Sequence, residues 1–145
     1  MIQAIFDLYQ QEHAAKKENK NEIKIYVSEK KMKVNINGFK KEYSVSTGAL
    51  KGQKLFANDL RTPLGRYKVI KIQDSTKWKF KTTSGAYGPW FIRLKTAWSG
   101  IGIHGIHDEN LIGDANSHGC IRLRNQDIHE LVAHVYKGLE VVIFP

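Results

Sequence analysis

Cysteine is almost absent from this chain, which has one thiol, Cys120, in 145 residues. An internal disulfide is therefore excluded, and cysteine usage leaves the redox compartment open. Long apolar runs are also absent, since no stretch approaches the ~18 residues that cross a membrane. The first residues lack the basic start and continuous apolar segment of a secretory signal peptide. We therefore expect one globular domain without a disulfide framework or a membrane span.

Acidic residues are scarce relative to basic ones. The chain has 23 Lys and Arg against 14 Asp and Glu, a formal net charge of +9, and the excess lies before residue 100. Such a charge attracts polyanions over ~8–10 Å, or it is a solvated surface that only confers solubility. Both interpretations stay open. No zinc-finger spacing, RNP-like aromatic pattern or Arg-rich helix is present, so we expect no nucleic-acid partner.

Apolar and polar residues alternate along most of the chain after residue 22. Alternating Ile and Val, then Met, Val and Ile, predict a hairpin over residues 23–36 with one apolar face. Further strands are predicted at 42–48, 66–72, 91–94, 100–104 and 140–144. The long polar segment 73–90 between two of them is typical of a lid or binding loop.

Helical spacing of apolar residues occurs at two places. The first is residues 2–17, and the second follows Asn125. We expect Asn125 to cap this second helix, its apolar stripe to reach Val135, and the helix to end at Gly138. The sequence therefore predicts a mainly β domain over residues 23–145, preceded by a helix and linker over residues 1–22.

Residues suited to covalent chemistry gather between positions 104 and 122. Three of the six histidines, His104, His107 and His118, lie within fifteen residues, and Cys120 follows directly. A cysteine nucleophile needs a base and amide donors for the oxyanion. His104, at a predicted strand end, and His118, beside the thiol, compete as the base, and Gly119 allows a close backbone approach. A nearby base would raise the thiolate fraction, so we expect fast alkylation of Cys120.

Two alternatives compete with a catalytic thiol. A lone cysteine is often a small buried residue, although the polar flanks "SHG" and "IRL" favour a working thiol here. The three clustered histidines and the thiol are also four possible zinc ligands. Structural zinc sites in short loops usually show paired C-x-x-C-like knuckles, so we expect no metal. His107 is predicted to face solvent, while His129 and His134 are predicted to lie on a helix surface or in helix packing.

The blocks "IHG" and "SHGCIRL", with "RTPLGRYKV", "GPWFIRL" and "EVVIF", resemble the L,D-transpeptidase catalytic domain of the YkuD-like family over roughly residues 23–145. The resemblance implies a mainly β, sandwich-like fold with one helix after the catalytic cysteine, which would lie in a gorge under a mobile lid. It implies Cys120 as the nucleophile, His104 as the general base and the Gly105 carbonyl as the group that orients this base.

The same resemblance implies roles for further residues. The amides of Gly119 and Cys120 would form most of the oxyanion hole, with a hydroxyl from Tyr87 in the lid. Ser117, His118 and Arg122 match family positions that line or brace the site. Arg122 would either grip a peptide carboxylate or anchor the structure internally. Trp90, an aromatic residue at the end of the long polar segment, is expected to contact the substrate.

The implied reaction is acyl transfer on peptidoglycan stem peptides through a thioester on the cysteine. An amine of a second stem would give a 3→3 cross-link, water would give L,D-carboxypeptidase activity, and a D-amino acid would give exchange. We expect stem peptides as partners, no cofactor, a monomer, and a periplasmic or wall-associated location that requires a leader outside this sequence. A catalytically silent cell-wall-binding module of the same fold is the alternative from another functional class.

Overall fold

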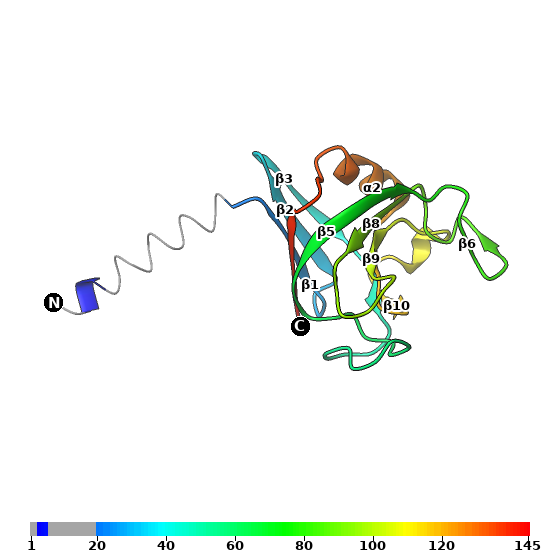
Figure 1. Ribbon diagram of the computed structural model, residues 1–145, viewed down its shortest axis with the longest axis horizontal. Coiled ribbons are helices and arrows are strands. Elements are labelled where there is room, and N and C mark those ends of the chain that lie inside the picture. The colour runs from blue at the N-terminus through cyan, green and yellow to red at the C-terminus, as the bar shows by residue number, and fades with distance from the viewer. Residues whose placement is uncertain (1–2, 6–19) are drawn as a thin grey trace.

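The structure of the protein, a computed structural model, describes residues 3–5 and 20–145 (Figure 1). Residues 3–5 are helical, and the rest of the predicted N-terminal helix lies outside the described residues. The division at residues 22 and 23 therefore stays a prediction. In the part of the chain that the structure describes, no helix is long and apolar enough to cross a membrane.

One eight-stranded sheet forms the body of the domain, with the order β11–β9–β8–β5–β12–β1–β2–β3. Its strands are β1 (Glu22–Tyr26), β2 (Lys31–Ile36), β3 (Phe39–Ser44), β5 (Gly65–Asp74), β8 (Trp90–Leu94), β9 (Gly102–His104), β11 (Ile121–Arg122) and β12 (Glu140–Phe144). Ser46, just after β3, bridges to Arg122 on β11, so the sheet curls until its two edges meet. The prediction of a mainly β domain is confirmed.

Two small sheets flank the large one. β4 (Thr47–Gly48) pairs with β10 (Ala115–Ser117), and β6 (Lys79–Phe80) pairs with β7 (Thr83–Ser84). A short 3-10 helix, η1 (Glu109–Leu111), lies in the connection between β9 and β10. The long segment predicted as a loop over residues 73–90 therefore contains a short hairpin, which projects from the body in Figure 1.

The hairpin predicted over residues 23–36 is confirmed. Its register places Ile23 opposite Val34 and Ile25 opposite Met32, and all four side chains are buried. Between β2 and β3, Asn37 and Gly38 both have positive φ, 49° and 85°. A two-residue turn of this kind matches the twist of antiparallel strands. The alternation thus puts one face of β1, β2 and β3 into the core.

Helix α2 (Asn125–Val132) packs its buried Ile128 and Leu131 into that core and contacts β8. The prediction that Asn125 caps this helix is wrong, because Arg124 holds the N-cap position without a side-chain hydrogen bond. The Asn125 side chain instead accepts a hydrogen bond from the Ile106 amide at 2.8 Å. The Asn125 side chain therefore bonds to a residue distant in sequence and does not cap its own helix.

The face of the sheet that points away from the core carries candidate site residues, among them His104 and Arg122. On β8, Ile92 is buried in the core, so its neighbours Phe91 and Arg93 point to the opposite face. Phe91 is paired with His104 on β9, and His104 is paired with Arg122 on β11. Side chains of directly paired residues share a face, so these three strands present one row of site residues.

Candidate active site

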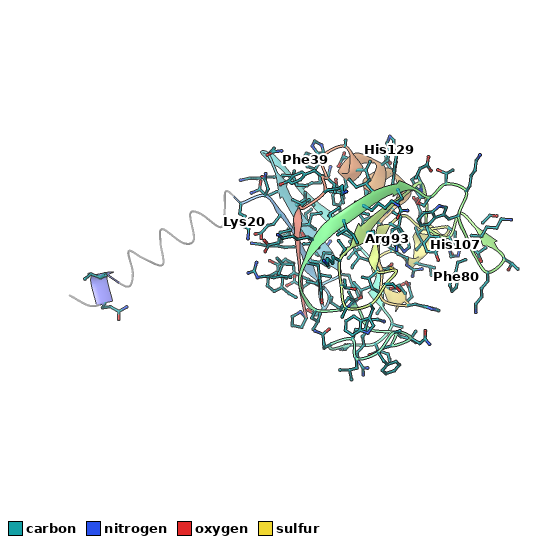
Figure 2. All side chains as sticks on the ribbon, viewed as in Figure 1. Lys20, Phe39, Phe80, Arg93, His107 and His129 are labelled. Carbon is teal, nitrogen blue, oxygen red and sulfur yellow. The ribbon has the colours of Figure 1, made fainter. Side chains whose placement is uncertain are left out.

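A cavity of about 450 Å³ opens over this row. Its lining includes all of the following candidate residues from the sequence: Tyr87, His104, Ser117, His118, Cys120 and Arg122. Residues of the β6–β7 hairpin form another part of the wall, and Figure 2 shows Phe80 and His107, two lining residues, at the same end of the molecule as β6. The structure therefore brings residues from four separate segments around one space.

His104 is held in one tautomer. Its Nδ1 lies 2.6 Å from the Gly105 carbonyl oxygen. Because a carbonyl only accepts hydrogen bonds, Nδ1 carries the proton and Nε2 is left as the acceptor. The ring stacks on Phe91 with centroids 5.3 Å apart, and Tyr87 meets it edge-on at 5.1 Å. The imidazole is thus fixed on three sides, with its basic nitrogen unprotonated.

Burial controls the charge of this imidazole. His104 is only 4% exposed, and desolvation lowers its pKa from 6.5 to about 4. The positive charge of Arg122 acts in the same direction, and the bond to the Gly105 carbonyl opposes it. His104 is therefore neutral at pH 7.

The thiol of Cys120 is half-buried and donates a hydrogen bond to the Gly100 carbonyl at 3.3 Å. Desolvation raises its pKa, against the lowering effects of the Gly102 amide and of nearby cations. The thiol and His104 are thus both neutral at pH 7, because burial outweighs the neighbouring charges. This differs from the raised thiolate fraction expected from the sequence.

The Cys120 thiol and the His104 imidazole belong to residues that line the same cavity. No hydrogen bond joins the two side chains within residues 20–145. The parallel register of β9 and β11 places His104 opposite Arg122, two residues beyond Cys120. Cys120 is therefore a diagonal neighbour of His104, and its thiol must leave the Gly100 carbonyl before a proton passes to Nε2.

A tight turn delivers Cys120 into the cavity. The Ser117 hydroxyl donates to the Cys120 carbonyl at 2.6 Å and accepts from the Gly119 amide at 3.2 Å. Gly119 has a φ of +133°, a backbone conformation that favours glycine. Its amide is already engaged, but at the long end of the N–H···O range, so a charged oxyanion would compete for it.

His118 lies on the outer part of the same turn. Its side chain is exposed, and its ring meets Phe80 of β6 edge-on at 5.5 Å. His107, predicted to face solvent, is also exposed. Of the clustered histidines, His104 is the one that is buried and oriented by a backbone partner.

Arg122 has two polar partners within the protein. Its Nε donates to the Ser46 hydroxyl at 3.1 Å, and its guanidinium also donates to Asn116 Oδ1. These bonds tie β11 to the segment after β3 and to β10. The side chain lines the cavity as well, so its roles as internal anchor and as carboxylate ligand are compatible.

Tyr87 and Trp90 behave differently. Tyr87 lines the cavity, and burial raises the pKa of its hydroxyl, which therefore stays protonated and able to donate. Trp90 does not line the cavity: it packs against the core, and its indole N–H donates to His129 at 3.4 Å. The structure therefore gives no support to the substrate contact expected of Trp90, because Phe91 lies on the site face of β8 and Trp90 on the opposite face.

Three residues near the site were missed in the sequence. Phe91 supports the His104 ring, and strand alternation around it could have indicated this. Asn125 touches the backbone at Gly105, where an added Cβ would meet its Oδ1 and, at 2.9 Å, the Cα of Gly88. Lys54 lies behind Gly119 in a segment without periodicity. For Asn125 and Lys54 the sequence offers no signal, because both contacts depend on tertiary packing.

No three His, Cys, Asp or Glu side chains within residues 3–5 and 20–145 are placed to hold a metal ion together. The four zinc ligands considered from the sequence therefore do not form such a group. His129 and His134, expected on a helix surface or in packing, contact Trp90 and stack on Phe39, respectively.

The family model described as the L,D-transpeptidase catalytic domain, YkuD, matches residues 20–143. The chain belongs to this family. The Bacillus subtilis (strain 168) protein YkuD, itself assigned to the L,D-transpeptidases, is 31% identical over 107 residues, which are 74% of this chain and 55% of that protein. A Bacillus licheniformis relative of the same name is 30% identical over 105 residues, 72% of this chain and 53% of its own length. The chain thus spans about half the length of the curated relatives it matches.

Solved L,D-transpeptidases share the fold. A crystal structure of a mutant Enterococcus faecium L,D-transpeptidase superposes with a TM-score of 0.67 at 22% identity, covering 86% of this chain and 50% of that chain. The catalytic domain of an L,D-transpeptidase from the same species, determined by NMR, gives 0.63 at 20% identity, covering 87% and 98%. The second comparison shows that this chain shares the fold of that domain over nearly its whole length.

Proposed function

We propose that the protein catalyses acyl transfer on peptidoglycan stem peptides, with Cys120 as the nucleophile. The observation that carries the proposal is the fixed tautomer and neutral charge of His104. Its Nδ1 proton is committed to the Gly105 carbonyl, which leaves Nε2 as the acceptor, and His104 lines the same cavity as Cys120. Family membership supports the reaction class, and the lone thiol beside a base of fixed tautomer supports covalent catalysis.

In the acylation step, Cys120 Sγ attacks the carbonyl that precedes the terminal D-amino acid of a donor stem. The thiol proton passes to His104 Nε2 as the C–S bond forms. The imidazolium then gives this proton to the leaving amine as the C–N bond breaks, and a thioester remains on Cys120. A neutral starting pair suits this sequence, because the base becomes charged only while the oxyanion forms.

The oxyanion would be stabilised by the Cys120 amide, by the Gly119 amide once it leaves Ser117, and by the protonated hydroxyl of Tyr87. In the second step, the amine of another stem attacks the thioester and restores the thiol, which gives a 3→3 cross-link. Water in place of the amine gives L,D-carboxypeptidase activity, and a D-amino acid gives exchange. The same side chains serve all three outcomes.

The proposed substrate is consistent with the charge of the outer sheet surface. An open hollow of about 790 Å³ over β1, β2 and β3 is lined by five lysines, Lys20, Lys24, Lys33, Lys40 and Lys41, and by two glutamates, Glu22 and Glu42. A net positive surface of this kind favours contact with an anionic wall. We therefore also propose an extracytoplasmic location, in the periplasm or at the wall, where peptidoglycan is found. The monomeric state stays a prediction.

Mass analysis of muropeptides tests the proposal. Purified disaccharide-tetrapeptides are incubated with the protein, alone and with an added D-amino acid, and the products are compared with those of Cys120→Ala. Dimers, tripeptides or exchanged tetrapeptides made only by the wild type would support the proposal and identify the acceptor. Muropeptides left unchanged by a folded wild type that still binds them would favour the silent wall-binding module.

A further inference from the structure

Lys54 is buried in a segment whose apolar residues are exposed. The lysine is 2% exposed, whereas its neighbours Leu55 and Phe56 are 70% and 58% exposed. Lysine is almost never fully buried unless its charge is compensated. The hydrophobic effect therefore does not explain why Lys54 is buried while Leu55 and Phe56 are exposed. The buried ammonium group must have a compensating environment.

The nearest carboxylate is occupied by other groups. Lys54 Nζ donates to the backbone carbonyl of Asp59. The Asp59 carboxylate accepts from the Leu55 amide at 2.8 Å and from Arg61 at 3.1 Å. Within residues 20–145, Lys54 forms no ion pair with a carboxylate within 4.0 Å. Part of its compensation must come from elsewhere.

The other neighbour of the ammonium is the turn that carries the thiol. A Cβ added at Gly119 would lie 3.4 Å from Lys54 Nζ and 3.1 Å from the Arg61 carbonyl oxygen. The same Nζ lies 5.9 Å from the centroid of the Trp98 ring. Lys54 does not line the cavity. Its charge thus lies against the backbone one residue before Cys120, outside the space that a substrate would fill.

We propose that Lys54 is a positioning residue, a buried counter-charge that stabilises the Cys120 thiolate through the Gly119 turn. Burial has the largest effect on both groups, raising the pKa of the thiol and lowering that of Lys54. The charge of Lys54 opposes the first shift, and the charges of Asp59 and then of the thiolate oppose the second. A fixed cation beside the turn stabilises negative charge as it develops on the sulfur or on the oxyanion, without reorganisation during the reaction. The inference rests on the proposed role of Cys120 as the nucleophile.

The pH dependence of alkylation tests this inference directly. Because Cys120 is the single thiol, the rate of its reaction with iodoacetamide reports its thiolate fraction at each pH. An opposite charge close to a titrating group typically shifts its pKa by a unit or more. We therefore expect Lys54→Met to react roughly tenfold more slowly than the wild type below the midpoint, with the same plateau rate at high pH. Lys54→Arg should keep most of the wild-type rate.

Lys51→Met is the matched control, because it removes one charge from an exposed lysine of the same segment. Its alkylation profile should equal that of the wild type. If Lys54→Met lowered the melting temperature but kept the wild-type profile, Lys54 would be only a structural residue and the inference would be overturned.

A second measurement avoids the risk that Lys54→Met fails to fold. The 13Cε resonance of Lys54 is followed by NMR through a pH titration of the wild type and of Cys120→Ser. We expect the wild-type resonance to respond at the pH where the thiol titrates, and this response to vanish in Cys120→Ser. A Lys54 resonance that does not shift as the thiol titrates would refute the coupling between Lys54 and Cys120. Neither measurement uses muropeptides, so failure here is distinguishable from failure of the proposed function.

Discussion

Lowering the pH from 7 to 5 should destabilise the folded domain by about 2 kcal/mol through His104 alone. The pKa of His104 is about 4 in the buried folded state, against its ordinary value of 6.5 in an unfolded chain. The unfolded state therefore binds the proton first as the pH falls. The stability that neutral His104 contributes is fully present above about pH 6.5 and is lost progressively down to about pH 4, where the loss reaches ~3 kcal/mol.

Urea unfolding at pH 7 and pH 5 measures this loss. The comparison protein is His104→Phe, which cannot titrate but keeps a ring to stack on Phe91. Carboxylates with lowered pKa, such as Glu130 and Glu140, titrate in both proteins, so the difference between the two pH-dependent losses isolates His104. His107→Gln, a change at an exposed histidine, is the control and should keep the wild-type loss.

The wild type should lose about 2 kcal/mol more than His104→Phe between these pH values. Equal losses in the two proteins would contradict this prediction, because they would mean that His104 binds its proton equally well in the folded and the unfolded state. Burial would then not lower the pKa of His104.

Three further predictions concern the site. His104→Ala should lower the rate of acylation, measured by mass spectrometry, roughly 10²-fold or more, which is the usual contribution of a positioned base. His118→Ala should lower this rate clearly less, and the reverse order would exchange the roles of the two histidines. Cys120→Ala should abolish thioester formation yet change the free energy of unfolding by only ~1 kcal/mol, since it removes one weak hydrogen bond at a cavity wall, and loss of folding would instead indicate a structural cysteine. Asn125→Ala should cost ~1–3 kcal/mol in urea unfolding by leaving the Ile106 amide without its acceptor, whereas Asn125→Asp should restore most of it, and equal stabilities of the two variants would contradict this role.

Alternation predicted the strands well where one face is buried. In β1 and β2 every second residue is apolar, and the register that pairs Ile23 with Val34 puts all of them into the core. The order of strands was beyond this reasoning. β12 lies parallel to β1 and antiparallel to β5, and no local pattern encodes pairings between strands so distant in sequence.

The site was predictable to the extent that it is local in sequence. His104 and Gly105 are adjacent, and Ser117, Gly119 and Cys120 form one turn, so motif and backbone logic apply to both groups. The charge state was not predictable, because neutral His104 results from its tertiary burial. The placement of Trp90 was also predictable, since the alternation of "WFIRL" assigns Phe91 and Trp90 to opposite faces of β8.

Intact-mass spectrometry of the protein shows whether Cys120 carries the acyl group during the reaction. The wild type is mixed with a donor tetrapeptide muropeptide without acceptor and quenched in acid within seconds. The mass should increase by that of the donor minus that of the free D-amino acid released, peptide mapping should place the adduct on Cys120, and Cys120→Ala should show no adduct. Turnover of muropeptides by Cys120→Ala, or an adduct mapped to another residue, would show that Cys120 is not the nucleophile.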